Sequence, residues 1–280
     1  MGDVLAPYSG FNLQGGYPQG TDPETYRTVP LQAVGDIYLA EDFSSYVLGS
    51  DPDLIAGFSE FNGTSVISDD LTRQTVKDVS KIATTTEWAN GFIHTIPSDL
   101  VEGDEAWIRM RIWLPVGSDL SAPGEGGHLK WFRWRTATNL AANAGFSDIY
   151  YDDAVGEWKY IKETVDLWSV LATGAGGPFD VEYGKWIDWE LYTKFSATVG
   201  VIRMWKDGVM INELLNEQTL TTTTDTVKDF YFRTYWNGGI PIQQDWHYDR
   251  VDMALNGAGR TDSTELQSDS NGNKFIGRTL

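Results

Sequence analysis

The sequence WIRMRIWLPVGSDLSAPGEGGHLKWFRWR, residues 107–135, decides the predicted fold. Residues 107–113 and 128–135 have the side-chain alternation of two β-strands, and the Pro and Gly residues between them predict a loop. Strands of this kind recur along the chain at roughly even spacing, with turn signals between them. This pattern is typical of an all-β sandwich.

The first of these strands separates apolar from cationic side chains. Successive side chains of a strand point to opposite faces, so Ile108, Met110 and Ile112 share one face. The opposite face holds Trp107, Arg109, Arg111 and Trp113. Indole rings mixed with guanidinium groups suit neither a core nor an inert surface, and they fit a polymer of sugar rings and carboxylates.

Composition bounds the class of protein. The chain has 280 residues, 41% of them hydrophobic, which supplies a sizeable core, and no low-complexity linker divides it. A formal charge of -19 argues against generic binding of nucleic acid or of anionic membranes, because both depend on positive potential. No segment reaches the roughly 20 apolar residues of a membrane helix. We therefore expect a single-domain, monomeric protein without a nucleic-acid or membrane partner.

The absence of cysteine excludes disulfides and thiolate metal sites. The first residues lack the basic and apolar regions of a secretory signal peptide. We nevertheless expect an extracellular or secreted protein, with association with a virion as an alternative.

The organisation of the chain follows from its periodicity. Residues 1–34 are rich in Gly, Pro, Gln and Tyr and predict an irregular N-terminal arm, residues 35–257 predict the sandwich domain, and residues 258–280 a polar tail. Residues 186–195 repeat the division between an apolar and a polar face. Asp207 and Gly208 between apolar strands predict a tight hairpin.

Seven short motifs, in this order, resemble those of the concanavalin-like jelly-roll polysaccharide lyases, the group that holds alginate, glucuronan and heparin lyases. The motifs are AEDF, WIRMRIWLP, GGHLKWFRW, KWIDWELYTK, MWKDG, FYFRTYWNGG and HYDRVDMAL. The resemblance implies a β-sandwich jelly roll of antiparallel sheets with a concave groove. It also implies cleavage of an acidic, uronic acid-containing polysaccharide by β-elimination, without an organic cofactor.

The sequence departs from the alginate lyase motifs at three places. The first strand keeps two arginines of the Arg-x-Glu-Leu-Arg pattern and lacks its glutamate. The Gln-x-His pair has a partial counterpart in His128, and the second tyrosine of Tyr-Phe-Lys-x-x-x-Tyr stands out of register at Tyr235.

Lyase chemistry requires a group that neutralises the uronate carboxylate and a base that takes the C5 proton. The candidate catalytic residues are His128, Tyr235, Tyr231 and Arg109. The candidate substrate-binding residues are Arg111, Trp107, Trp113, Lys130, Arg233, Asn237, Glu190 and Lys194. We expect the strands that carry the cations and tyrosines to share one sheet. Each residue also has a structural interpretation, as a salt-bridged sheet face or a packed aromatic.

Two other functions fit the same residues. A glycoside hydrolase of this fold carries Glu-x-Asp-x-Glu, and retention requires two carboxyl groups close together. Asp188 and Glu190 supply two of these positions, and Trp186 occupies the first. A non-catalytic carbohydrate-binding or virion-adhesion module needs the groove and no base.

Carboxylates on the first and last predicted strands suggest a structural calcium ion, since jelly rolls often place these strands side by side and calcium prefers oxygen ligands. The candidate ligands are Glu41, Asp42, Asp249 and Asp252, with surface acids as the alternative interpretation. His94 and His247 lack metal-ligand spacing, and we interpret both as structural.

Overall fold

The computed structural model describes residues 37–41, 43–52, 58–60, 65–71, 74–80, 88–89, 91–121, 129–136, 145–152, 156–162, 167–172, 181–207, 209–236, 239–240, 242–255, 266–268 and 274–276. These residues form strands and connections, without an α-helix among them. The predicted N-terminal arm at 1–34 lies outside the described residues.

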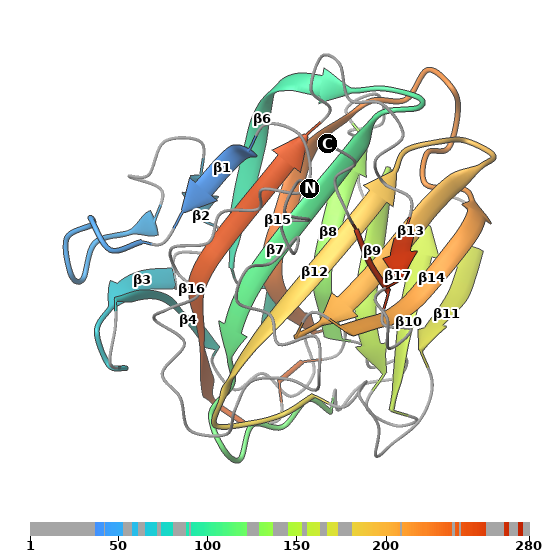
Figure 1. Cartoon of the computed structure of the whole chain (residues 1–280). Helices are drawn as coiled ribbons and strands as arrows, with labels where there is room; N and C mark the ends of the chain where they lie inside the picture. Colours follow the sequence, from blue (N-terminus) through green and yellow to red (C-terminus); the bar gives the residue numbers. More distant parts are fainter. Residues whose placement is uncertain are drawn as a thin grey trace, which may run out of the picture.

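Two antiparallel sheets make up the domain (Figure 1). Sheet A contains, in spatial order, β14 (Val209–Glu217), β13 (Gly200–Lys206), β12 (Trp186–Lys194), β7 (Glu105–Trp113), β16 (Gln244–Leu255), β4 (Thr75–Ser80) and β3 (Ser65–Ser68), with β1 (Ile37–Glu41) also paired to β16. Sheet B contains β11 (Leu167–Ala172), β10 (Glu157–Lys162), β9 (Phe146–Asp152), β8 (Leu129–Thr136), β15 (Val227–Trp236), β6 (Phe92–Leu100) and β2 (Phe58–Glu60), with β5 (Trp88–Ala89) paired to β15.

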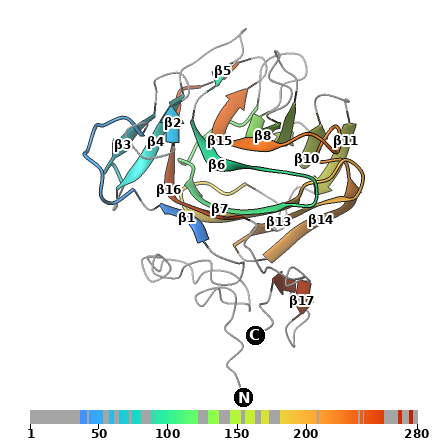
Figure 2. The ribbon, with the colours of Figure 1, turned by 90° about the horizontal axis from the view of Figure 1, so that it is seen from above.

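The sheets lie face to face, as the view from above shows (Figure 2). The predicted all-β sandwich is therefore confirmed. Within the polar tail, β17 (Leu266–Ser268) and β18 (Lys274–Ile276) form a separate two-stranded unit, and β18 contacts β14. No helix long and apolar enough to cross a membrane occurs in the part of the chain that the structure describes.

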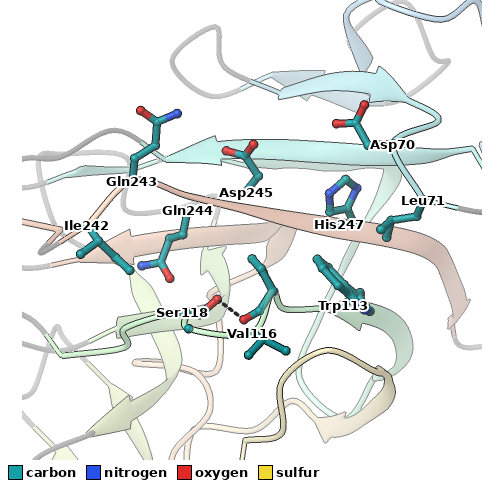
Figure 3. Close-up of a pocket in the computed structure, with 12 residues that line it drawn as sticks. Asp70, Leu71, Trp113, Val116, Ser118, Ile242, Gln243, Gln244, Asp245 and His247 are labelled. Atoms are coloured by element: carbon teal, nitrogen blue, oxygen red, sulfur yellow. Dashed lines mark hydrogen bonds between the residues drawn. The ribbon is translucent and has the colours of Figure 1, made fainter.

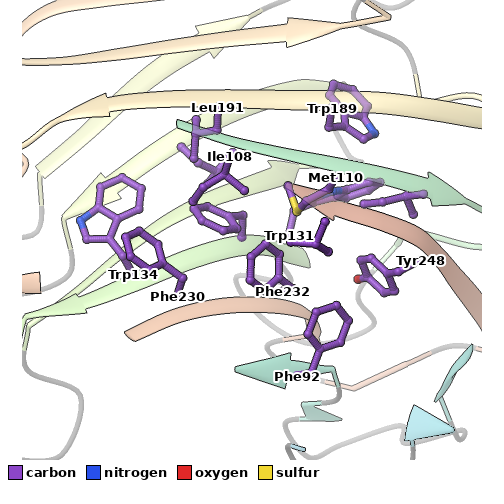
Figure 4. Close-up of a cluster of buried hydrophobic side chains, with 14 of the residues drawn as sticks. Phe92, Ile108, Met110, Trp131, Trp134, Trp189, Leu191, Phe230, Phe232 and Tyr248 are labelled. Atoms are coloured by element: carbon purple, nitrogen blue, oxygen red, sulfur yellow. The ribbon is translucent and has the colours of Figure 1, made fainter. Parts of the chain in front are cut away.

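The core is an aromatic layer between the two sheets (Figure 4). From sheet A it receives Ile108, Met110 and Ile112, as the alternation of β7 predicted. From sheet B it receives Trp131, whose ring centroid lies 5.7 Å from that of Trp189 on β12. Burial of such large rings supplies most of the favourable free energy of folding and fixes how the sheets face each other.

The predicted hairpin at Asp207 is present, because β13 and β14 pair with Lys206 opposite Val209. Asp207 has a φ of 48°, the left-handed conformation that a tight hairpin turn requires. Its Oδ1 accepts a hydrogen bond of 3.0 Å from the backbone N–H of Asp188. Burial, and then the neighbouring Asp188 carboxylate, raise the pKa of Asp207 from 3.8 to about 6.

The raised pKa of Asp207 predicts a pH-dependent gain from Asp207→Asn. The folded chain holds this proton more tightly than the unfolded chain, so the stability contributed by the protonated carboxyl is lost as pH rises through about 6. Asparagine keeps the oxygen acceptor, tolerates the positive φ and cannot ionise. We expect equal stability near pH ~4 and a gain of about 1–3 kcal/mol above pH ~7 in denaturant unfolding.

The matched control is Asp99→Asn at an exposed acid on β6. It should show no such divergence between the two pH values. A gain from Asp207→Asn that is the same at both pH values would contradict the titration.

Candidate functional site

The predicted site residues lie on two different sheets. Arg109 and Arg111 belong to β7 of sheet A, whereas Lys130 belongs to β8, and Tyr231 and Tyr235 to β15, of sheet B. The expectation that these strands share a sheet is wrong. The chain crosses from one sheet to the other in the connection between β7 and β8, so the two strands of the opening motif end on opposite sides of the core.

Buried ion pairs lie on the outer face of sheet A, which is the face turned away from the core. Arg109 Nε lies 3.3 Å from Asp188 Oδ1 on β12, and Arg111 Nη1 lies 3.5 Å from Asp249 Oδ2 on β16. These four side chains are at most 2% exposed. Breaking a buried pair leaves an uncompensated charge, so each arginine here stabilises its own carboxylate partner.

Carboxylates outnumber guanidinium groups on this face. Its buried charged side chains are Arg109, Arg111, Arg250, Asp188, Glu190, Asp249 and Asp252. Among the described residues of this face, three positive and four negative groups leave one formal negative charge. This balance opposes the binding of a uronate carboxylate.

Other predicted substrate-binding residues also lie on sheet A. Trp107 is fully buried and stacks on Trp205 with ring centroids 5.5 Å apart. Lys194 of β12 lies opposite Glu105 of β7 in the strand register. Trp113 ends β7 and is partly exposed, so it alone of these three presents an aromatic surface at the edge of the layer.

The predicted carboxylate cluster is partly assembled. Strands β1 and β16 do lie side by side, with Glu41 opposite Val251. The Glu41 carboxylate accepts hydrogen bonds from the Phe43 backbone N–H at 2.7 Å and from the Tyr46 hydroxyl at 3.0 Å. It therefore serves the adjacent turn.

Ion pairs engage two other predicted calcium ligands, Asp249 and Asp252. Asp252 lies 2.7 Å from Arg250, and burial outweighs this arginine and raises the pKa of Asp252. Within the described ranges, no group of three or more His, Asp or Glu side chains is placed to hold a metal ion. Asp42 lies outside these ranges, and calcium binding stays a prediction.

A β-bulge in β8 shapes the outer face of sheet B. Trp131 and Phe132 are adjacent, yet both belong to the core. The register of β8 against β9 shifts between Lys130 and Phe132, as an extra residue requires. As a result, Lys130 and Arg133, three positions apart, lie on the same outer face.

Lys130 is the centre of a row that crosses three strands. It is opposite Tyr150 of β9 on one side and opposite Tyr235 of β15 on the other. The Lys130 ammonium lies 4.9 Å from the centroid of the Tyr235 ring, which is within the range of a cation–π contact. Two phenols therefore flank one ammonium group.

Arg133 is the centre of the next row, between Asp148 of β9 and Tyr231 of β15. Its guanidinium group donates through both Nε and Nη2 to the two oxygens of Asp148, the second bond being 2.9 Å long. The same group lies 3.7 Å from the centroid of the Phe146 ring. Lys130 Nζ is 3.9 Å from Asp148 Oδ2, which joins the two rows into one cluster.

In this cluster of Lys130, Arg133, Asp148 and the flanking tyrosines, two cations share one buried carboxylate. Lys159, paired with Asp152 and Glu157, lies beside it on the next strand. Burial, followed by the carboxylates of Asp152, Glu157 and Asp148, raises the pKa of Tyr150 above its ordinary value. Tyr150 therefore stays protonated at neutral pH, as a hydrogen-bond or proton donor must.

Sequence reasoning missed Asp148 and Tyr150, which lie on the cluster side of β9 because Ile149 and Tyr151 belong to the core. The available signal was the position of Asp148 and Tyr150 on either side of the apolar Ile149. Of the predicted residues near this cluster, Arg233 lies in β15, while His128 and Asn237 fall outside the described residues.

The arrangement predicts a strong effect of Asp148→Asn on stability. The substitution leaves the buried Arg133 guanidinium and the adjacent Lys130 without their shared carboxylate, which should cost about 3–5 kcal/mol of unfolding free energy. The matched control on the same strand is Asp152→Asn, whose partner Lys159 is partly exposed; it should cost about 0–1 kcal/mol. Equal losses for the two variants in urea denaturation would contradict a buried, shared carboxylate.

Comparisons with solved structures identify the fold. A mutant of alginate lyase Aly36B in complex with alginate trisaccharide has a TM-score of 0.55 and 16% identity, over 80% of this chain and 100% of that one. Alginate lyase vAL-1 from Chlorella virus has a TM-score of 0.51 and 14% identity, over 69% and 89%. An endo-1,3-beta-glucanase from Streptomyces sioyaensis has a TM-score of 0.49 and 11% identity, over 80% and 97%.

By sequence, the chain matches no protein family and no curated protein. The structural likeness to the two alginate lyases establishes that the chain has a β-sandwich jelly-roll fold.

Proposed function

We propose that the chain is a polysaccharide lyase that cleaves a uronic acid-containing polymer at the outer face of sheet B. The observation that carries the proposal is the cluster of Lys130 and Arg133 between tyrosines on the outer face of sheet B, in a chain of net charge -19. Two solved structures of the same fold are alginate lyases, which supports the choice of reaction.

The cations of the cluster suit the first requirement of β-elimination. A uronate carboxylate next to C5 must lose part of its negative charge before the C5 proton becomes acidic enough to remove. Lys130 lies opposite Tyr150 on one side and Tyr235 on the other, whereas Arg133 holds the Asp148 carboxylate with two hydrogen bonds. We assign Lys130 to the substrate carboxylate and Arg133 to the positioning of Asp148.

The tyrosines suit the proton transfers. In the proposed reaction, Tyr235 acts as its phenolate and takes the proton from C5, the C4–O bond breaks as the C4–C5 double bond forms, and a second, neutral phenol protonates the leaving oxygen. Tyr150 fits the second role because it stays protonated, and Tyr231, opposite Arg133, is the alternative donor. The proposal does not need His128, whose predicted role as base is tested by the same assay.

The decisive assay follows the absorbance of unsaturated uronate products. The chain is incubated with alginate, glucuronan, pectate or glycosaminoglycans, and at least one polymer should give a rise. Lys130→Met and Tyr235→Phe should each lower kcat/KM by about 100-fold or more, as removal of one preorganised catalytic group does. His128→Ala would show whether the histidine contributes.

Matched controls come from partly exposed residues beside sheet A. Lys185→Met and Tyr183→Phe repeat the two substitutions at residues that are each 38% exposed, and both should keep full activity. Binding of a uronate polymer without any absorbance rise would support a binding module instead. New reducing ends without the absorbance would support the hydrolase.

A further inference from the structure

A pocket of about 460 Å³ opens on the outer face of sheet A, where β7 ends and β16 begins (Figure 3). It is on the opposite side of the sandwich from the Lys130 cluster. Its volume lies within the usual range of ligand pockets, about 300–1,000 Å³. Its lining includes Asp70, Trp113, Val116, Ile242, Gln243 and Asp245.

The floor of the pocket is fixed by packing within the sheet. Trp113 pairs with His247 across β7 and β16, and their rings meet edge to face with centroids 5.6 Å apart. His247 Nδ1 lies 2.9 Å from the hydroxyl oxygen of the buried Thr75. These contacts hold the indole in place without a ligand, so binding would not have to order it.

The wall formed by residues 114–118 is also held in place. The backbone N–H of Gly184 donates to the Leu114 carbonyl at 2.7 Å, and the Ser118 hydroxyl donates to the Pro115 carbonyl at 2.8 Å. A Cβ atom at Gly184, whose φ is 70°, would lie 2.6 Å from Val116 Cγ2. The wall can therefore approach this turn because residue 184 is glycine.

The wall carries apolar surface that faces solvent. Val116 of this wall is 81% exposed, and Ile242, which also lines the pocket, is 36% exposed. The side chain of Gln244 fixes the next part of the loop, accepting from the Asp119 backbone N–H at 3.1 Å and donating to its carbonyl at 2.8 Å. An aromatic floor between exposed aliphatic side chains matches the apolar face of a pyranose ring.

The polar groups of the pocket favour a neutral ligand. Asp245 lines the pocket and is partly exposed, so its carboxylate can accept a hydrogen bond there. The Asp70 carboxylate is bonded to Lys77 at 2.5 Å, so among the described residues two acids and one lysine leave one formal negative charge. Burial lowers the pKa of His247 to about 4, so this histidine adds no positive charge at neutral pH. The pocket therefore repels a uronate and offers an acceptor to a hydroxyl group.

We propose that this pocket binds one residue of a neutral glycan, with Trp113 and Val116 against the apolar face of the sugar and Asp245 accepting a hydroxyl hydrogen bond. The site is separate from the proposed lyase site, because it lies on the other sheet. It would attach the chain to neutral polysaccharide while the other face acts on an acidic one.

The test is titration of the full chain with cellohexaose, laminarihexaose, mannohexaose and maltohexaose, followed by saturation-transfer NMR and calorimetry. At least one of them should bind saturably. Trp113→Ala and Asp245→Ala should each weaken binding by about tenfold or more, the effect expected for loss of one stacking or hydrogen-bonding group. Asp99→Ala, at an exposed acid on sheet B, should bind as the unsubstituted chain does.

A variant that leaves Trp113 and His247 intact serves as a control for misfolding. In Gly184→Ala the new methyl group would contact Val116 and displace it. This variant should weaken binding less than Trp113→Ala does, and its near-ultraviolet circular dichroism spectrum should be unchanged. Lys130→Met should abolish any lyase activity and leave neutral-glycan binding unchanged, so the two proposals fail separately. Absence of binding by all four hexasaccharides would overturn the pocket assignment. So would Trp113→Ala and Asp245→Ala variants that bind as tightly as the unsubstituted chain.

Discussion

The indole of Trp131 joins the two sheets through contacts with Trp189 and Trp246 of sheet A, at centroid distances of 5.7 and 4.9 Å. Phe132, the next residue, also enters the core. Two adjacent inward side chains are possible in a strand only with a bulge, and this bulge moves Lys130 onto the same outer face as Arg133. The packing of the core and the composition of the candidate site therefore have one cause.

A second constraint is the cost of burying charge. In sheet A, carboxylates next to the buried arginines offset this cost, as in the pair of Arg109 and Asp188. Sheet B meets it differently, with Asp148 shared between Lys130 and Arg133 and with aromatic rings beside the cations. In sheet B two cations share one buried carboxylate, whereas in sheet A Arg109 and Arg111 each have a carboxylate of their own. The two faces of the sandwich therefore stabilise buried charge by different arrangements.

Much of the fold was predictable from local patterns. The period-two alternation in β7 and β12, the Asp207 turn and the pairing of β1 with β16 all follow from residues close together in sequence or from the fold that they imply. The candidate site was predictable only in part. Lys130, Tyr231 and Tyr235 were identified as residues, but they were assigned to one sheet with Arg109, and the β9 residues Asp148 and Tyr150 were not recognised.

The sequence by itself determined that the chain is a β-sandwich, which strands it has in outline, and that cations and aromatic rings share strand faces, because alternation and turn chemistry act over a few residues. Only the tertiary structure decided which strands face one another. The residues 128–135 mix polar and apolar side chains on both alternating sets, so their alternation assigns neither set to the core. The contact of Trp131 with the opposite sheet decides which of these side chains enter the core. That contact joins residues far apart in the chain, and it is such packing that stabilises the bulge.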